Sequence, residues 1–227
     1  MNRIKSYEEL TFNLVRWIKD YYWMHSGVIK AFVVGVSGGI DSAVVSTLCA
    51  ITDIPTYVLT MPLHSKTENT ELSEAHAYKL VEKYSNVTLV NVDLSETYDK
   101  FMWAIDDTFT SSDLTNANTK ARLRMSTLYQ IAGSVGGIVV GTGNKVDLYK
   151  TEVWELGKFL DVDPRIIEAD PTDGLWDDSR TDEDQLGASY AQLEEAMELG
   201  TGPGVEVLKK FQAQNKHKME PIPTFKL

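Results

Sequence analysis

Cysteine and long apolar runs are both scarce in this sequence of 227 residues. Cys49 is the only cysteine, so the chain cannot close an internal disulfide and offers no set of thiols for a structural zinc site. No run of about twenty apolar residues occurs, and the opening MNRIKSYEEL contains no apolar signal-peptide segment. These absences exclude a disulfide scaffold and a membrane-spanning helix, and we expect a cytoplasmic protein.

Basic residues are few relative to acidic ones. The chain has 22 Lys and Arg against 33 Asp and Glu, which gives a formal net charge of −11 at pH 7. A surface of this sign repels the phosphate backbone of nucleic acids and anionic lipid headgroups. We therefore expect neither a nucleic-acid nor a membrane partner, and any anionic ligand must be held by a local basic or dipolar site.

The apolar residues, 43% of the sequence, suffice for a substantial core. Short β-rich runs alternate with longer segments at helical spacing, which is typical of an α/β protein with an open parallel sheet flanked by helices. The strands are expected over 31–36, 56–60, 87–92 and 138–140, and the helices over 10–21, 41–51, 77–84, 121–132, 153–160, 190–199 and 205–214. The segments beyond Thr151 all have helical spacing. We therefore predict a helical C-terminal part within one domain, residues 1–227.

Several side chains are assigned to ordinary structural environments. Cys49 lies on the helix expected after the first strand and is predicted to be a small core residue. His64 and His76 lie on or beside a polar helix start and are expected to be solvated. Three tryptophans are expected to pack rather than to stack on bases: Trp103, Trp154 and Trp176.

The most informative segment is VGVSGGIDSA, residues 34–43, which stands between a predicted strand and a predicted helix. The adjacent glycines Gly38 and Gly39 let the backbone turn sharply and approach a ligand closely. Ser37 and Ser42 offer hydroxyl donors, and the dipole of the following helix favours an anion at its start. The segment lacks the lysine of the G-x-x-x-x-G-K-[ST] loop and does not fit G-x-G-x-x-G.

Asp41 is unexpected in a phosphate-binding segment. An acid repels a phosphate unless a cation lies between them, so the functional interpretation is a Mg²⁺ ligand. In the alternative interpretation, Asp41 or Ser42 only caps the helix and Gly38-Gly39 is an ordinary turn. The spacing by itself is compatible with both.

The segment SGGIDS, residues 37–42, resembles the SGGxDS loop of the N-type ATP pyrophosphatases, which activate a carboxyl, carbonyl or related oxygen by transferring AMP from ATP. Six further segments resemble, in the same order, those of ammonia-dependent NAD synthetases. They are NTKARLRM at 118–125, VVGTGNK at 139–145, LYKTEV at 148–153, PTDGLW at 171–176, TDEDQLG at 181–187 and NKHK at 215–218. The likeness covers nearly the whole chain and implies the Rossmann-like fold of that superfamily.

This resemblance implies roles for individual residues. The implied ATP-binding residues are Gly35, Val36, Ser37, Gly38, Gly39, Ile40, Asp41, Ser42, Thr142, Lys150 and Thr172. Asp41 would also bind Mg²⁺, and Lys150 would neutralise phosphate charge. Arg122, His217 and Lys218 would hold the dinucleotide substrate.

These polar residues also have structural interpretations. Local cations at Arg122, Arg124, Lys145, Lys150 and Lys218 are a means by which a chain of net charge −11 tolerates a ligand with several phosphates. Taken singly, however, Arg122 and Arg124 fit solvated helix charges, and Lys150 fits a surface ion pair with Glu152. Thr172 fits an N-cap, and His217-Lys218 fits a tail.

The sequence departs from the family pattern between Lys145 and Leu148. The family carries there a loop with Thr-Lys and Gly-Asp-Gly-Gly, which supplies a lysine and an aspartate to the substrate and a second Mg²⁺-binding acid. Either a mobile lid is missing from the sequence as written, or a real deletion leaves a chain that binds nucleotide but catalyses poorly. We favour the first explanation, because lids that close over substrates are often disordered without them.

The resemblance implies a ligase that joins ammonia to deamido-NAD at the expense of ATP, giving NAD, AMP and pyrophosphate through an adenylated carboxylate. This is the final step of NAD biosynthesis. The implied state is a homodimer whose interface helps to form the dinucleotide site. No glutaminase domain fits in the chain, which favours ammonia as donor, although a separate glutaminase subunit remains possible. The alternatives are the same chemistry on nicotinate mononucleotide or another acceptor, and a non-catalytic nucleotide-binding protein.

Overall fold

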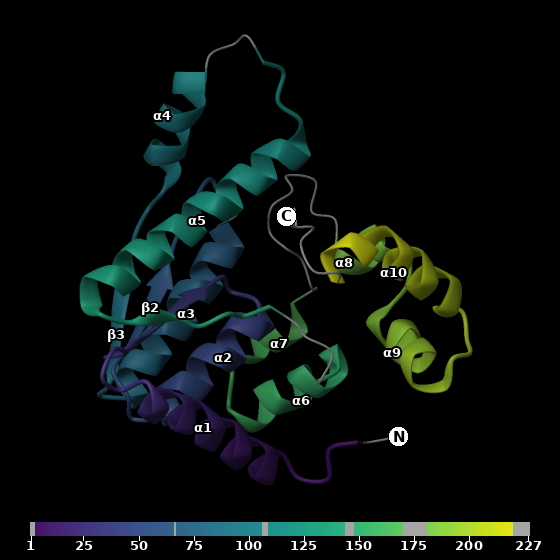
Figure 1. Ribbon diagram of the computed structural model, residues 1–227, viewed down its shortest axis with the longest axis horizontal. Coiled ribbons are helices and arrows are strands. Elements are labelled where there is room, and N and C mark those ends of the chain that lie inside the picture. Colours follow the sequence, from purple (N-terminus) through teal and green to yellow (C-terminus); the bar gives the residue numbers. More distant parts are fainter. Residues whose placement is uncertain (1–2, 66, 106–108, 144–147, 170–180, 220–227) are drawn as a thin grey trace, which may run out of the picture.

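The computed structural model describes residues 3–65, 67–105, 109–143, 148–169 and 181–219, apart from the side chains of 182, 185 and 214–219 (Figure 1). Four parallel strands form one sheet in the order β3-β2-β1-β4. The strands are β1 (Phe32–Val36), β2 (Thr56–Thr60), β3 (Val87–Asn91) and β4 (Ile138–Val139). No helix among these residues is long and apolar enough to cross a membrane.

Ten helices are found in the described residues. They are α1 (Tyr7–Met24), α2 (Ile40–Ile51), α3 (Thr67–Lys83), α4 (Ser95–Ile105), α5 (Asp113–Val135), α6 (Lys150–Phe159), α7 (Pro164–Glu168), α8 (Asp182–Leu186), α9 (Tyr190–Leu199) and α10 (Val205–Met219). The strand order reverses at β1, because β2 and β3 extend the sheet on one side and β4 on the other. In doubly wound sheets such a reversal opens a crevice at the carboxyl ends of the strands.

Both faces of the sheet are covered by helices. Successive side chains of a strand point to opposite faces, and β1 follows this rule with two fully buried neighbours. Val33 packs with Leu59 and Ala132 on the side covered by α5, whereas Val34 packs with Cys49 on the side covered by α2. A strand buried on both faces is typical of a parallel sheet, and its rigid carboxyl end positions the loop that follows.

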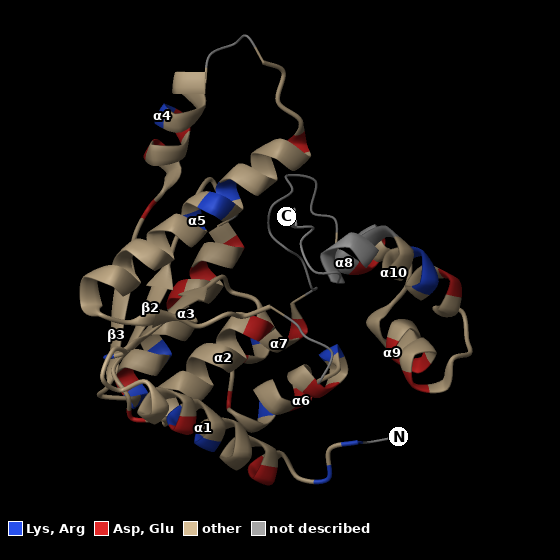
Figure 2. Cartoon of the chain, in the orientation of Figure 1, with Lys and Arg blue, Asp and Glu red and all other residues tan. Residues whose placement is uncertain are grey.

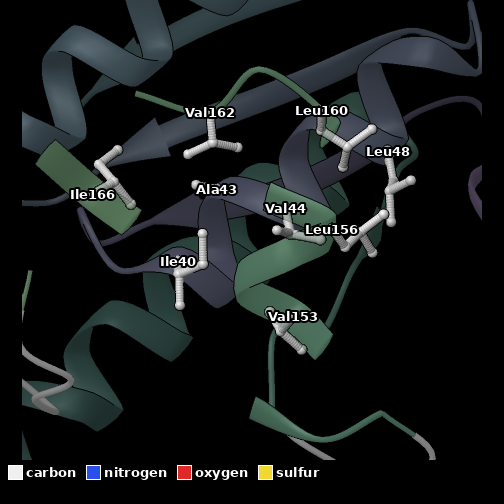
Figure 3. Close-up of a cluster of buried hydrophobic side chains, with 9 residues drawn as sticks. All are labelled: Ile40, Ala43, Val44, Leu48, Val153, Leu156, Leu160, Val162 and Ile166. Carbon is white, nitrogen blue, oxygen red and sulfur yellow. The ribbon is translucent and has the colours of Figure 1, made fainter. Parts of the chain in front are cut away.

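A second layer of helices lies on the outer side of α2. Nine buried residues of α2, α6, α7 and the segment between the last two form one apolar cluster, drawn in Figure 3: Ile40, Ala43, Val44, Leu48, Val153, Leu156, Leu160, Val162 and Ile166. Fully burying one such aliphatic side chain contributes about 1.5–3 kcal/mol. This cluster fixes α6 against α2, so the first turns of the two helices lie side by side.

The C-terminal helices α8, α9 and α10 form a group beside the sheet domain, at the right of Figure 1. Within the group α9 packs on α10, and α9 also contacts α6. The predicted α/β fold with a helical C-terminal part is therefore confirmed. The predicted strands agree with β1 to β4 within one or two residues, whereas α4, α7 and α8 had no counterpart among the predicted elements.

Two predicted environments are wrong. Trp103 is 86% exposed, so it does not pack in the core of the described residues. His76 is buried, with 2% exposed, although it was expected to be solvated. It faces α2 from α3, and its Nε2 lies 3.0 Å from the hydroxyl of Ser46. Cys49 is buried as predicted, and burial raises the pKa of its thiol to about 12.

His76 predicts how stability depends on pH. Burial, followed by the charge of Lys79, lowers the pKa of His76 from 6.5 to about 4. Below pH 6.5 His76 is protonated in the unfolded chain but stays neutral in the folded chain. The free energy of unfolding therefore falls as the pH is lowered from 6.5 to about 4. We expect a loss of about 3 kcal/mol over this window, since one pH unit corresponds to about 1.4 kcal/mol.

Urea unfolding of the wild-type chain and of His76→Gln at pH 7, 6, 5 and 4 measures this dependence. The variant should lose most of the extra slope between pH 6.5 and 4 while carboxylate titration continues in both proteins. Parallel stability curves for the two proteins would contradict the assignment.

Candidate functional site

The loop after β1 is held in a tight turn by its own hydroxyl groups. The Ser42 hydroxyl accepts the backbone N–H of Ser37 at 3.1 Å and donates to the Gly39 carbonyl at 2.9 Å. Gly38 has φ +85°, and a Cβ on it would lie 2.7 Å from the carbonyl oxygen of Asn69. Only glycine combines this backbone conformation with this close approach.

The start of α2 has free donors rather than a side-chain cap. Its N-cap is Gly39, so the interpretation in which Asp41 or Ser42 caps the helix is wrong. The first N–H groups of a helix have no partner within it, and together with the helix dipole they favour an anion. The loop and the helix start thus form the geometry of a phosphate site.

Lys150, the first residue of α6, lies beside this helix start. Its Nζ is 2.6 Å from Oδ2 of Asp41, and its side chain is only 6% exposed. The interpretation of Lys150 as the surface partner of Glu152 is therefore wrong. Glu152 instead accepts two hydrogen bonds from Arg3, which hold the pKa of that carboxyl below its usual range.

Asp41 keeps one acceptor unused. Its Oδ1 is buried and has no hydrogen-bond partner among the residues that the structure describes, while Oδ2 is bound by Lys150. A buried carboxylate oxygen without a donor is costly, and a bound cation would remove that cost. The arrangement therefore suits a hard divalent ion that also coordinates phosphate oxygens.

A cleft of about 360 Å³ adjoins the loop at the carboxyl ends of β1, β2 and β4, between α3 and α5. Four predicted nucleotide residues line it, namely Gly35, Val36, Ser37 and Thr142. Its other walls are mostly apolar, with several polar side chains among them: Met61, Pro62, Ser65, Asn69, Thr70, Ser73, Ala121, Arg124, Met125, Leu128, Tyr129 and Val139. A cleft with apolar walls and a few placed polar groups is suited to a flat heterocycle and its sugar.

Arg124, which the sequence offered only as one of several local cations or as a solvated helix charge, lies on the wall of this cleft. Its Nε donates to the carbonyl of Met61 at 3.1 Å and its Nη2 to the hydroxyl of Ser65 at 3.2 Å. Burial lowers the pKa of Arg124, and no acidic side chain of the described residues counteracts that shift. A half-buried cation on a cleft wall with only neutral acceptors is a ready partner for an electron-rich ligand.

Arg122 lies on a different face of α5. It is exposed and does not line the cleft. Side chains two positions apart on an α-helix, such as those of Arg122 and Arg124, point in directions roughly half a turn apart. Figure 2 shows this basic part of α5 as a blue segment along the helix. The repeated arginines look equivalent in the sequence, and only the burial of α5 against the sheet distinguishes them.

The structure does not test the remaining predicted site residues. Thr172 lies outside the described residues, as do Lys145 and residues 146–147 of the junction. His217 and Lys218 belong to α10, and their side chains are outside the description. The structure therefore brings together the loop, Asp41, Lys150 and Thr142, and its described side chains do not test the grouping of Arg122 with His217 and Lys218.

Comparison with known proteins places these features in context. The sequence model of the family described as NAD synthase matches residues 10–148 and 146–222, and its two parts meet at the junction where a loop was expected. An NH(3)-dependent NAD(+) synthetase from Carboxydothermus hydrogenoformans is 30% identical over 240 residues, which span 94% of this chain and 95% of that protein.

Two solved structures share the fold. One, described as NMN synthetase from Francisella tularensis, superposes with a TM-score of 0.87 and 28% identity, covering 99% of this chain and 100% of that one. Another, an NH3-dependent NAD synthetase from Campylobacter jejuni, has a TM-score of 0.74 and 22% identity, covering 98% of this chain and 100% of that one. At that identity the second match bears on the fold alone.

Proposed function

This chain belongs to the NAD synthase family, and from that premise we propose that it catalyses the ATP-dependent amidation of deamido-NAD by ammonia. The products are NAD, AMP and pyrophosphate, and the enzyme is a ligase that forms a C–N bond. The observation that carries the proposal is the pair of Lys150 and Asp41 at the uncapped start of α2, with Nζ and Oδ2 2.6 Å apart.

The chemistry proceeds in two steps. A carboxylate oxygen of the nicotinate ring attacks the α-phosphorus of ATP, and pyrophosphate leaves with the electron pair of the broken P–O bond. Ammonia then attacks the carboxyl carbon, AMP leaves, and the nitrogen loses a proton to give the amide. The first step is needed because a carboxylate accepts nitrogen poorly until its oxygen is a good leaving group.

Residues of this chain stabilise charge on the departing pyrophosphate. The N–H groups at the start of α2 and the ammonium of Lys150 are fixed before the reaction begins, so no rearrangement is needed when charge develops. Lys150 exchanges its contact with Asp41 for the phosphate oxygens. The cleft beside the loop would hold the adenosine, with Thr142 and Ser37 on its wall. Thr172 is proposed as a further ATP contact from the family motif.

We infer that Mg²⁺ is the cofactor and that Asp41 is one of its ligands. Support comes from the buried, unpartnered Oδ1, because Mg²⁺ is commonly held by one or two carboxylates together with substrate phosphates. When bound, it would draw charge from the phosphate oxygens. The described residues contain no group of three or more His, Cys, Asp or Glu placed to hold a metal by themselves, so phosphate and water are expected to complete its shell.

A homodimer is proposed because α4 and the start of α5 carry large apolar side chains that are exposed. They are Phe101, Trp103, Ile105 and Leu114. Arg122 is also exposed on α5, so a partner subunit seated there would place this proposed dinucleotide residue at the interface. His217 and Lys218 are proposed to complete that site. Residues 1–227 are proposed to form one domain that works in the cytoplasm.

Nicotinate mononucleotide is a second candidate acceptor. The structure that superposes at a TM-score of 0.87 over the whole chain is described as an NMN synthetase. The junction at 146–148 also departs from the family pattern, in which a loop supplies contacts to the substrate. The chemistry would be unchanged, and only the acceptor would lack the adenylate half.

The test is pyrophosphate release by the purified chain with ATP, Mg²⁺, ammonium and either acceptor, each component being omitted in turn. Release that requires deamido-NAD, with NAD formed only when ammonium is present, supports the proposal. A preference for nicotinate mononucleotide in direct competition supports the second candidate. Turnover with glutamine in place of ammonium would contradict ammonia as the donor, and ATP binding without any release would indicate a non-catalytic protein.

Arg124 gives a prediction for ATP affinity. Replacing it with methionine keeps much of the apolar stem but removes a half-buried cation and its hydrogen bonds to Met61 and Ser65. We expect ATP to bind about tenfold more weakly, because a hydrogen bond to a charged group contributes about 1.5–3 kcal/mol. Calorimetric titration with Mg·ATP measures the change, and Arg16→Met, which removes an exposed charge from α1, serves as control. Equal affinity in both variants would refute the role.

A further inference from the structure

The first turn of α6 is bound by a carboxylate from the C-terminal helices. The backbone N–H of Thr151 donates to Oε1 of Glu194 at 3.1 Å, and its hydroxyl donates to Oε2 at 2.7 Å. Glu194 belongs to α9 and lies 43 residues further along the chain. The first N–H groups of a helix have no partner within it, so Glu194 supplies from another element what a local cap usually supplies.

A second contact of α9 reaches Lys150 itself. The ring centroid of Tyr190 lies 5.6 Å from the ammonium of Lys150, within the range of a cation–π interaction. The same ring packs edge-on against Trp154, with centroids 6.2 Å apart. One turn of α9 therefore contacts the proposed triphosphate lysine through Tyr190 and its neighbour Thr151 through Glu194.

Apolar packing of α9 does not explain why the carboxylate of Glu194 lies at the contact with α6. Leu193 and Ala196 are the buried apolar residues of α9, and they suffice to dock a short helix. Glu194 is half-buried, and both of its carboxylate oxygens accept hydrogen bonds from Thr151, the residue that follows Lys150. Desolvating a carboxylate carries a free-energy cost. Docking α9 through apolar side chains alone would avoid that cost, so the carboxylate points to a role beyond docking.

We propose that Glu194 is a positioning residue for Lys150. By binding both the N–H and the hydroxyl of Thr151, it fixes the first turn of α6 and with it the place of the Lys150 ammonium beside Asp41. The proposal rests on the proposed function, in which Lys150 stabilises the departing pyrophosphate. It also links the helices that carry His217 and Lys218 to the ATP site, because α9 packs on α10.

The test compares Glu194→Ala with Glu194→Gln and with Glu195→Ala, which removes an exposed carboxylate at the next position of α9. The Glu194→Ala variant should bind Mg·ATP about tenfold more weakly and release pyrophosphate with a kcat about tenfold lower, as expected for lost hydrogen bonds to a charged group. The KM for ammonia should not change. Glu194→Gln should stay within about twofold of wild type, because its amide oxygen and NH₂ group still reach both Thr151 atoms.

Every other outcome of this test either overturns or supports the positioning role of Glu194. Wild-type ATP affinity and kcat in a folded Glu194→Ala variant, or equal losses in Glu194→Ala and Glu195→Ala, would overturn the proposal. If Glu194→Ala does not fold, Thr151→Val and Thr151→Ser replace it: a loss in the valine variant only supports the proposal, and equal behaviour overturns it. The binding arm needs no acceptor, so weaker ATP binding without any turnover in the wild type would reject the proposed function and retain the positioning role.

Discussion

Replacing Lys150 with methionine is expected to lower the rate of pyrophosphate release by about 10²–10³-fold, the usual cost of removing one preorganised donor from a reacting centre. The Lys150 side chain is 6% exposed, and its ammonium stands 2.6 Å from Oδ2 of Asp41 at the start of α2. Water cannot replace it at this depth, and methionine has a similar length without the charge. Single-turnover release of pyrophosphate at saturating ATP and acceptor measures the effect on the chemical step.

The matched control is Lys158→Met. Lys158 lies on the same helix but is 55% exposed and pairs with Glu155 on the surface, where an ion pair contributes about 0–1 kcal/mol. We expect turnover within about twofold of wild type. Retention of more than a tenth of the wild-type rate by the Lys150 variant would remove that residue from the mechanism.

Asp41 needs separate treatment, because the Lys150 variant also leaves this carboxylate without its cation. Breaking a buried pair by removing one partner is destabilising, whereas replacing both charges is much less so. A double variant, Asp41→Asn with Lys150→Met, should therefore recover stability but not activity. Activity that returns with stability would show that the single variant failed only by unfolding.

Substituting Gly38 with alanine is expected to reduce kcat/KM for ATP by about 10²-fold. A Cβ at φ +85° carries a strain of about 1–3 kcal/mol, and it would lie 2.7 Å from a backbone oxygen, which cannot rotate away. The loop must move, and a displacement of about 1 Å in a positioning group can cost about 10²-fold in rate. Steady-state kinetics with varied ATP measures the loss.

Gly133→Ala is the control for this variant. Gly133 lies in α5, and a Cβ added there meets no atom within 4 Å, so turnover and melting temperature should stay close to wild type. Unchanged ATP kinetics in Gly38→Ala, with an intact fold, would contradict a binding role for the loop as the structure has it.

The sheet and the phosphate loop could be predicted from the sequence because their signals are local. The strand 56–60 is found where its β-branched and aromatic residues predicted it, and the SGGIDS segment begins α2 as expected. In both cases a few consecutive residues carry the whole pattern: a run of β-branched and aromatic residues for the strand, and glycines before a helix start for the loop.

The rest of the site depends on packing between distant segments. Nothing near Lys150 in the sequence indicates that its partner is Asp41 rather than Glu152, because 109 residues separate the pair and α6 must first pack on α2. Arg122 and Arg124 likewise differ only in which side of α5 faces the sheet. The buried His76 was mistaken for a solvated residue because the helix around it is rich in charge, and α3 buries only a narrow stripe.

The long separation between contacting residues sets the order in which a newly made chain acquires its parts. Residues 32–91, which hold the phosphate loop and three strands, leave the ribosome well before Lys150 exists. Arg3 is made long before its partner, since Glu152 follows 149 residues later, a delay of roughly 7–30 s at synthesis rates of about 5–20 residues per second. A nascent chain can thus pair three of its four strands early, whereas the lysine proposed to bind the triphosphate is added only after β4.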